Sequence, residues 1–398
     1  MSYDAPFRGL KVIDLSQGIA GPYCGMLMAQ YGADVIKVEG GGDCDWSRVL
    51  GVRYGDHSAF SIIGNLGKRS VAIDLKQDPG KALLWKLIEG ADVFIEGFRP
   101  GVIQRLGFGW EEVSARAPRL VYLSISGFGQ HGPLVGRPAM DPVLQAFTGL
   151  TGENHGEDGI PHRVPVIPVD MATSLYAFQA LSATLYGRRD EARGRYLDAS
   201  LMQGAAGLQA IRMMSSFLEG GPVRPGGVPH GIFRTRDGWL SVTAIRDREW
   251  QGLCAALERP DLGGEPRYAD PDGRFRHEAE LLGILREHLA TRTTAEWSAR
   301  LTEHQVMHEK VNRYADFLQE PQVAAVDLIA WLEQPDMPRP VPVARLPGVP
   351  RFESGAPLST APRVGQHTAQ VLGEHGIAAP EIDALARAGI IDLGDATA

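Results

Sequence analysis

One acidic residue of the chain, Asp170, lies where a carboxylate can act as a nucleophile. It follows the apolar segment 164–169, whose composition is β-like, and precedes a helix predicted by apolar residues at helical spacing up to Gly187. At a helix start the free N–H groups and the positive end of the helix dipole favour the ionised carboxylate that nucleophilic catalysis requires. Because Asp is also a favoured N-cap residue, this segment alone leaves two interpretations open, a nucleophile and a simple helix cap.

The segment 17–25 offers backbone groups that can stabilise a negative charge. Gly18, Gly21 and Gly25 have the spacing G-x-x-G-x-x-x-G, which differs from the G-x-G-x-x-G of a dinucleotide-binding loop and argues against NAD. Glycine still permits a close approach of the backbone, and the N–H groups at the following helix start can hold an anion or a developing oxyanion.

Cationic residues gather near the ends of predicted strands. In a protein with a net charge of −8, several cations at one edge of a sheet indicate a polyphosphate site, although each taken alone can be a solvated surface charge. The candidates are Lys68, Arg69, Arg99, Arg105 and Arg137.

The sequence does not indicate a metal site. His304 and His308 are spaced i, i+4 but lack the glutamate of an H-E-x-x-H motif, and Cys24, Cys44 and Cys254 match neither a zinc pattern nor a disulfide framework. The acidic net charge argues against nucleic acid as a partner. Since no apolar run reaches the ~18 residues of a membrane span, and the N-terminus lacks the apolar core of a signal peptide, we expect a cytoplasmic protein that does not enter a membrane.

The elements that position these residues alternate between strands and helices. This alternation predicts an α/β fold with a largely parallel, doubly wound sheet. Apolar runs predict strands at 10–15, 34–39, 70–74, 92–96 and 120–126, and periodic patterns predict helices at 22–31 and 79–89.

A segment rich in Gly and Pro, residues 219–231, marks a predicted domain boundary. After it come a hairpin around Asp237-Gly238 and helical patterns at 250–257, 278–290 and 294–303, which predict a small α+β domain. The expected division is a large Rossmann-like domain at 1–222, a small domain at 223–322 and a C-terminal return to the large domain at 323–398.

Several segments, in order along nearly the whole chain, resemble the class III CoA-transferase family, which includes formyl-CoA transferase, carnitine CoA-transferase and the α-methylacyl-CoA racemases. They are LKVIDLSQGIAGPYCGMLMAQYGADVIKVE, GKRS followed by VAIDLK, EGFRPGVIQRLG, SISGFGQHGP, DPVLQAFTGL, the Asp170 segment, FRTRDGWLSV and RTTAEW. The resemblance implies an interlocked homodimer of Rossmann-like chains. It also implies an enzyme that takes an acyl-CoA donor and a carboxylic acid acceptor, with coenzyme A thioester as substrate and no permanently bound cofactor.

In this resemblance Asp170 matches the nucleophile that forms an acyl-aspartyl anhydride and then an aspartyl-CoA thioester. Ile19, Ala20 and Gly21 resemble the loop whose backbone N–H groups face the reacting acyl group. Further matches are Lys68, Arg69, Phe98, Arg105 and Arg137 at CoA-contacting positions, beside Arg99, and Gly226 and Gly227 in the glycine-rich loop over the active-site Asp.

The chain differs from the family that it resembles at several positions. Ile19 stands where formyl-CoA transferase has Gln, and Gly40 stands where the family has an Arg that follows the second strand. Met140-Asp141 stands where the racemases have His-Asp, and because methionine cannot transfer a proton, a CoA-transferase is favoured over a racemase. The alternatives are an acyl-CoA racemase or isomerase, and a noncatalytic protein that binds CoA or a nucleotide.

Overall fold

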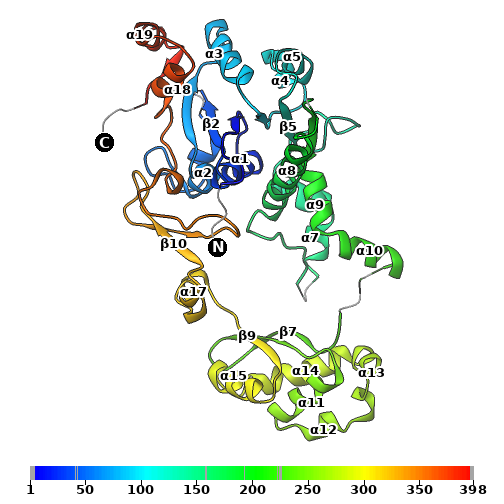
Figure 1. The fold of residues 1–398 in the computed structure, drawn as a ribbon. Helices are drawn as coiled ribbons and strands as arrows, with labels where there is room; N and C mark the ends of the chain where they lie inside the picture. The colour runs from blue at the N-terminus through cyan, green and yellow to red at the C-terminus, as the bar shows by residue number, and fades with distance from the viewer. Residues whose placement is uncertain are drawn as a thin grey trace. The chain divides into compact units, whose positions relative to one another are not determined.

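The structure is a computed structural model that describes residues 5–40, 42, 44–156, 159–191, 193–221, 223 and 226–394. The chain forms two compact units, one made of Met1–Ile211 with Asp327–Ala398 and the other of Arg212–Val326 (Figure 1). The three-part division at 222/223 and 322/323 remains a prediction about domains.

The first unit contains a seven-stranded sheet with the order β12-β3-β2-β1-β4-β5-β6. Neighbouring strands are parallel except for β12, which runs antiparallel to β3. The strands are β1 (Lys11–Asp14), β2 (Asp34–Glu39), β3 (Arg69–Ile73), β4 (Val93–Glu96), β5 (Val121–Ser126), β6 (Tyr196–Ser200) and β12 (Ile391–Asp392). The predicted α/β fold with a mostly parallel sheet is therefore confirmed.

Helices and short turns complete the first unit. The helices are α1 (Ala20–Gln30), α2 (Ala59–Asn65), α3 (Asp78–Glu89), α4 (Val102–Leu106), α5 (Trp110–Arg116), α6 (Asp141–Phe147), α7 (Leu150–Glu153), α8 (Pro168–Gly187), α9 (Leu201–Leu208), α18 (Thr368–Glu374) and α19 (Ala379–Arg387). The 3-10 turns are η1 (Trp46–Val49) and η3 (Pro357–Ser359), and β10 (Ile329–Leu332) pairs antiparallel with β11 (Val341–Ala344).

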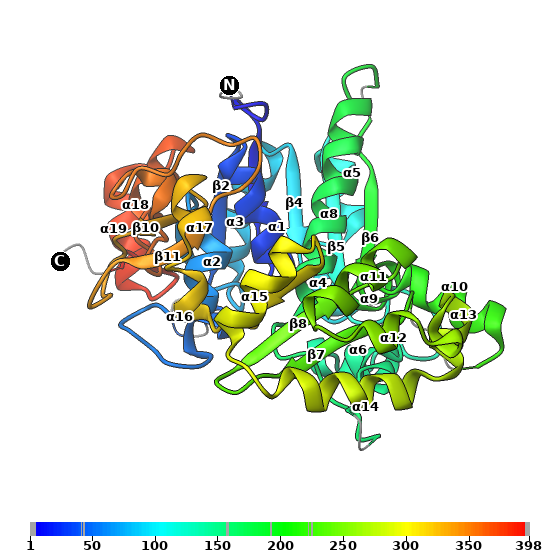
Figure 2. The same ribbon diagram turned by 90° about the horizontal axis from the view of Figure 1, so that it is seen from below.

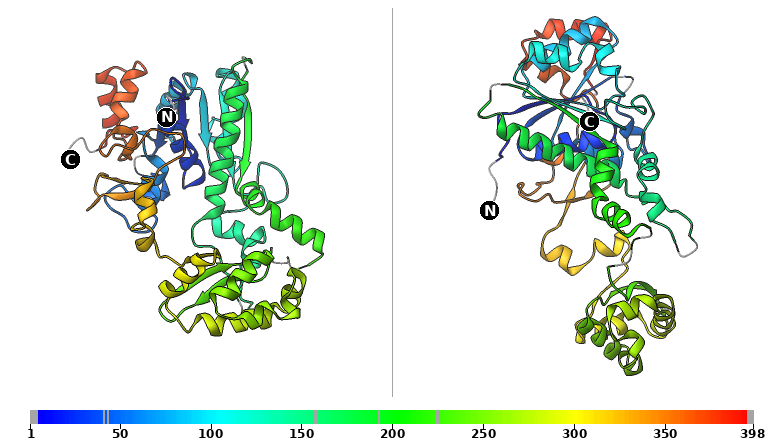
Figure 3. Two further views of the ribbon diagram at one scale, coloured as in Figure 1. Left: turned by 60° about the horizontal axis from the view of Figure 1, so that its bottom comes forward. Right: turned by 90° about the vertical axis from the view of Figure 1, so that its right-hand side faces the viewer.

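The sheet is covered by helices on both faces (Figure 3). Its side chains alternate between two cores. On β1, Ile13 packs in the core that includes α3, α18 and α19, whereas Val12 packs in the core that includes α1 and α8. This double burial explains why the parallel strands are continuous apolar runs. Loops at the carboxyl ends of such strands are the usual place for a ligand.

The apolar segment before α8 is not a strand, so its β-like prediction is wrong. Residues 164–166 are irregular, Ile167 has a φ of 46° in the left-handed region, and Pro168 opens the helix. Pro165 and Pro168 each lack the N–H that a strand ladder needs, which is the physical reason for the difference.

The second unit is an α+β structure with its own core. Its antiparallel sheet has the order β7-β8-β9, of which β7 and β8 are labelled in Figure 2. Trp250 and Trp297 are fully buried in its hydrophobic core. The predicted hairpin is confirmed as β7 (His230–Arg234) with β8 (Trp239–Thr243), and the predicted helices as α11 (Asp247–Ala256), α14 (Glu278–Leu289) and α15 (Thr294–Glu303). The other elements are α10 (Ala210–Glu219), which begins just before the unit, α12 (Pro260–Gly263), η2 (Pro266–Tyr268), α13 (Pro271–Arg276), β9 (Met307–Lys310), α16 (Tyr314–Phe317) and α17 (Pro321–Ala325).

Along the part of the chain that the structure describes, no helix combines the length and apolarity needed to cross a membrane.

Candidate active site

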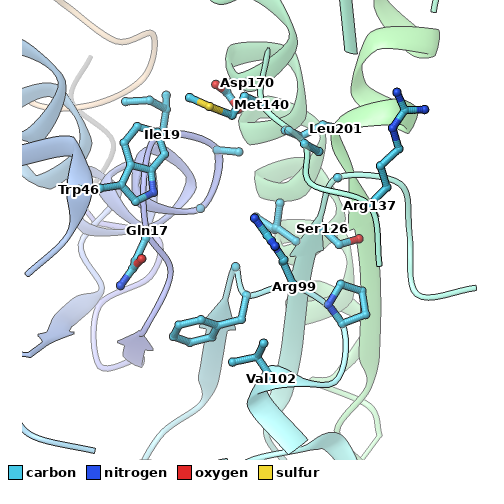
Figure 4. A pocket seen from close by; sticks show the side chains of 18 of the residues that line it. Gln17, Ile19, Trp46, Arg99, Val102, Ser126, Arg137, Met140, Asp170 and Leu201 are labelled. Atoms are coloured by element: carbon cyan, nitrogen blue, oxygen red, sulfur yellow. The ribbon is translucent and has the colours of Figure 1, made fainter. Parts of the chain in front are cut away.

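A cavity of about 730 Å³ opens in the first unit at the carboxyl ends of β1, β4 and β5 (Figure 4). Loops after these strands form its walls, together with η1 and the first turn of α8. The residues predicted from the sequence that line this cavity are Ile19, Ala20, Gly21, Phe98, Arg99, Arg137 and Asp170. The structure thus brings the candidate nucleophile, the candidate oxyanion loop and two candidate cations to one place.

Asp170 lies in the first turn of α8, but its side chain does not cap the helix. The cap is supplied by Asp141, whose Oδ2 accepts hydrogen bonds from the backbone N–H groups of Val169 (2.7 Å) and Asp170 (3.1 Å). Among the described residues, none donates a hydrogen bond to the carboxylate of Asp170, which faces the cavity beside Met140 (Figure 4). The simple helix-cap interpretation of Asp170 is therefore wrong, and the side chain is left available for chemistry.

Burial, followed by the negative charge of Asp141, raises the pKa of Asp170 to about 7. The sequence predicts that the helix start favours the ionised form of Asp170, whereas in the structure its pKa is raised and the ionised form is disfavoured. The N–H groups that would stabilise the Asp170 carboxylate are already bound to Asp141, which brings a second negative charge close to it. Near neutral pH Asp170 is thus divided between a protonated and an ionised form.

The contact of Asp141 with the start of α8 is a feature of the candidate site that sequence reasoning missed. The side chain of Asp141 is only 2% exposed, and its Oδ1 accepts a hydrogen bond of 2.5 Å from Gln145 Nε2. The Gln145 amide also binds the backbone N–H and C=O of Val164, both at 2.9 Å, so α6 fixes the segment that leads to Asp170. The available signal is the Asp141-Pro142 pair, since proline in a first turn marks a helix start next to an acid.

Two buried ion pairs hold the loop before α1. Asp14 accepts a hydrogen bond from Ser16 N–H (3.0 Å) and pairs with Lys68 (2.6 Å). Asp45 accepts one from Gly18 N–H (2.9 Å) and pairs with Lys37 (2.8 Å). All four charged side chains are buried, so they fix the loop from the protein interior. The opposite side of the loop lines the cavity.

The start of α1 is shaped to bring backbone groups into the cavity. Gly18 has a φ of 82°, and a Cβ at this position would lie 2.3 Å from the Trp46 ring, so only glycine fits. Ala20 and Gly21 form the first turn, where N–H groups have no acceptor within the helix, and both residues line the cavity. These N–H groups can stabilise an oxyanion.

Lys68 and Arg69 are not brought to the cavity. The side chain of Lys68 is fully buried and donates to Asp14, to the Pro22 carbonyl (2.7 Å) and to Asn65 Oδ1 (3.1 Å). Arg69 binds the carboxylates of Asp34 and Glu374. Both cations are paired with carboxylates of the protein, which gives them a structural role. Their contact with CoA stays a prediction.

A second cavity of about 840 Å³ adjoins the first, since Gln17 and Phe98 line both. It is bordered by Gly40 after β2, by Lys76 after β3 and by Leu106 at the end of α4. Arg105, the neighbour of Leu106, is exposed. Lys76 is a cation that the sequence analysis missed, although it ends the quoted segment VAIDLK.

Gly226 and Gly227 belong to the second unit, between α10 and β7. The carbonyl of Gly227 lies 2.7 Å from His230 Nδ1, and a Cβ at Gly227 would lie 2.5 Å from the Ile245 side chain. In the described ranges no group of His, Cys, Asp and Glu residues is arranged to hold a metal ion.

Comparisons with known proteins place these features in context. The family model of CoA-transferase family III matches residues 7–368. The chain is similar to the human succinyl-CoA:glutarate CoA-transferase, with 30% identity over 380 residues that cover 93% of this chain and 86% of that protein. It is also similar to the acetyl-CoA:oxalate CoA-transferase of Acetobacter aceti, with 32% identity over 368 residues that cover 89% and 95% of the two chains. Among solved structures, a CAIB/BAIF family protein from Brucella suis superposes with a TM-score of 0.82 at 28% identity, covering 93% of this chain and 99% of that one.

Proposed function

The chain belongs to CoA-transferase family III, and it is therefore an enzyme that moves coenzyme A from an acyl-CoA thioester to a free carboxylic acid; from this premise we propose that Asp170 is its nucleophile. The proposal depends on one observation. Among the described residues none donates a hydrogen bond to the carboxylate of Asp170, and this carboxylate lies in a cavity that the first turn of α1 also lines.

In the first step, an Asp170 carboxylate oxygen attacks the thioester carbonyl carbon of the acyl-CoA donor. The carbonyl oxygen becomes an oxyanion, which the N–H groups of Ala20 and Gly21 stabilise. When the C–S bond breaks, the electron pair leaves with sulfur, so the products are an acyl-aspartyl anhydride and the CoA thiolate. The negative charge that began on Asp170 ends on the thiolate.

In the second step, the CoA thiolate attacks the side-chain carbonyl of Asp170 in the anhydride. The donor acid leaves as a carboxylate and an aspartyl-CoA thioester remains. The acceptor carboxylate then attacks the carbonyl carbon of this thioester and expels the CoA thiolate, which gives a new anhydride. The thiolate attacks the acceptor's acyl carbon in this anhydride, which releases the new acyl-CoA and restores the Asp170 carboxylate. Each step exchanges one carboxyl derivative for another, which divides a difficult exchange into easier ones.

We propose that CoA occupies the two adjoining cavities. Arg99 and Arg137 supply positive charge in the first cavity and Lys76 in the second, and Phe98 borders both. An elongated ligand with an acyl end at Asp170 and phosphate groups further along suits this arrangement. Arg105 lies at the surface of α4 next to the second cavity and stays a candidate phosphate contact.

The homodimer is also part of the proposal. Helix α10 exposes large apolar side chains, with Ile211 82%, Phe217 86% and Leu218 74% accessible. A helix with such a face is expected to be covered by protein, and a second copy of this chain is the proposed cover. The interlocked arrangement, the placement of Gly226 and Gly227 over Asp170 and a cytoplasmic location remain predictions.

Trapping of the intermediates tests the nucleophile. The enzyme is incubated with an acyl-CoA and quenched with hydroxylamine, which converts an activated carboxyl group to a hydroxamate, and peptides are analysed by mass spectrometry. Modification of Asp170 and of no other carboxylate is expected, and Asp170→Asn should show neither modification nor turnover. Turnover with an unmodified Asp170 would refute the proposal.

The remaining alternatives give other results. A racemase or isomerase exchanges the α-proton of a single acyl-CoA with deuterated water, and this needs two bases; Met140, which lies beside Asp170, cannot serve as one. A noncatalytic binding protein retains CoA binding in Asp170→Asn and turns over nothing in either form. We expect transfer to an added carboxylic acid with no α-proton exchange.

A further inference from the structure

Glu96 is a buried acid that the proposed chemistry does not use. It is the last residue of β4, its side chain is 2% exposed, and it immediately precedes residues 97–100, which line the first cavity. Residues of this loop face the cavity, with the Arg99 side chain projecting into it (Figure 4). A carboxylate placed directly beneath a ligand-binding loop needs an explanation, because an unpaired buried charge is costly.

The hydrogen bonds of Glu96 connect this loop to β5. Glu96 Oε2 accepts a bond of 2.9 Å from the backbone N–H of Phe98, and Glu96 Oε1 accepts a short bond from Ser124 Oγ. Ser124 Oγ in turn accepts a bond of 2.9 Å from Gln130 Nε2. Gln130, Ser124 and Glu96 therefore form a chain of side chains that ends on the backbone of the loop.

We propose that Glu96 is a positioning residue that holds the loop 97–100, and through it Phe98 and Arg99, in the geometry that binds CoA. The inference rests on the proposed function, because it requires CoA to occupy the cavity that Arg99 lines. Glu96 does not touch the reacting atoms, and its effect is on affinity for CoA and not on the chemical steps.

The loop before α1 is held by carboxylates that differ from Glu96 in their pairing. Asp14 and Asp45 hold the loop before α1 in the same way, through backbone N–H groups, but each is paired with a buried lysine. Glu96 has no cation at ion-pair distance among the residues that the structure describes. The titratable groups facing it are Asp198 and Tyr196 of β6 and Tyr122 of β5. The charge of Glu96 is thus balanced by hydrogen bonds alone.

Because no cation is paired with Glu96, the strength of its hydrogen bond to the loop 97–100 depends on pH. Burial, with a smaller effect of Asp198, raises the pKa of Glu96 to about 7, although the bonds from Ser124 and Phe98 act in the opposite direction. Above this pH the carboxylate accepts both hydrogen bonds with full charge. Below it one oxygen carries a proton, and the charge-assisted bond to the Phe98 N–H is weakened.

The test measures CoA binding by calorimetry, and KM and kcat for an acyl-CoA donor, at pH 6 and pH 8. Glu96→Gln removes the charge but keeps the shape, and we expect CoA affinity at pH 8 to fall about fivefold or more, with kcat changed by less than about twofold. The matched control is Glu111→Gln, the same change at an exposed position on α5. Because a phosphomonoester of CoA also titrates near pH 6, the readout is the pH dependence of each variant relative to wild type. This dependence should shrink in Glu96→Gln and stay unchanged in the control.

The outcomes are distinct. An unchanged CoA affinity in Glu96→Gln, or a lower kcat with unchanged affinity, would overturn the inference. Wild-type protein that turns over acyl-CoA without binding CoA in these cavities would instead contradict the proposed CoA site. If Glu96→Gln fails to fold, Ser124→Ala replaces it; the loss of the hydroxyl should raise the pH at which CoA affinity falls, and an unshifted profile overturns the inference.

Discussion

Replacing Asp170 with Asn should abolish transfer and at the same time stabilise the protein at alkaline pH. The substitution keeps the size of the side chain and removes its charge. The reason for the stabilisation lies in the pKa of Asp170, which burial and the neighbouring Asp141 raise to about 7. An ionised Asp170 is therefore less favourable in the folded protein than in the unfolded chain, where the pKa of Asp is about 3.9.

The sign and size follow from proton linkage. As pH rises above about 4 the unfolded chain loses its proton from Asp170 first, so the folded state becomes less stable until the folded carboxyl ionises near pH 7. The stability present in acid is lost over this window, by about 1–2 kcal/mol at pH 5 and by at most about 4 kcal/mol at pH 8. For a unit of this size the gain in Asp170→Asn corresponds to a Tm increase of about 2 °C at pH 5 and up to about 7 °C at pH 8.

Scanning calorimetry of wild type and Asp170→Asn between pH 5 and pH 8 measures this difference. The matched control is Asp78→Asn, because Asp78 also lies in the first turn of a helix, α3, but its side chain is 94% exposed. The control should lower Tm slightly at every pH, since an exposed acid at a helix start is favourable. A Tm difference for Asp170→Asn that is absent, or that does not grow with pH, would refute the argument that burial and Asp141 disfavour the charge.

Further predictions concern activity and stability. Below pH 7, kcat/KM for the acyl-CoA donor should fall about tenfold per pH unit, because protonated Asp170 cannot attack. In Asp141→Asn this fall should begin at a lower pH, because the negative charge that raises the pKa of Asp170 is removed. Identical pH profiles for wild type and Asp141→Asn would contradict this effect of Asp141 on Asp170. Gly18→Ala places a Cβ 2.3 Å from an indole ring at a φ of 82° and should cost about 2 kcal/mol or more, seen as a lower Tm. Lys68→Met leaves Asp14 buried without its cation and should destabilise the protein by about 3–5 kcal/mol in denaturant unfolding; a normal stability with a raised KM for CoA would support Lys68 as a ligand contact.

The sheet could be predicted largely from the sequence because its central strands are buried on both faces. Such strands are continuous apolar runs, and the predicted segment 34–39 coincides with β2. The edge strand β6 reads YLDAS, in which Asp198 is exposed, and this pattern does not separate a strand from a loop. Residues 164–169 were apolar enough to suggest a strand, but their prolines exclude one.

The candidate site could be predicted only in part. The types of residue at Asp170 and in the loop before α1 indicate their chemistry, since a carboxylate at a helix start and backbone N–H groups near glycine need only local sequence. The distances between charges depend on the fold. Lys68 and Asp14 are 54 positions apart and yet form a buried ion pair, and Asp141 reaches α8 from a separate helix. The position of a cation near a strand end in the sequence therefore does not show whether its side chain faces a ligand or a buried carboxylate.

In the proposed mechanism the raised pKa of Asp170 favours covalent catalysis, although it also lowers the stability of the folded protein. In a largely buried place beside Asp141 the ionised carboxylate is disfavoured, and acylation relieves this penalty because the charge of Asp170 passes to the departing thiolate. The anhydride and the aspartyl-CoA thioester both leave Asp170 neutral. In the proposed mechanism Asp141 thus has two effects. Its hydrogen bonds to Val169 and Asp170 orient the start of α8, and its charge shifts the balance from the free carboxylate toward the proposed covalent intermediates. The repulsion from Asp141 disfavours the ionised form of Asp170 and, for the same reason, favours its conversion to a neutral acyl derivative.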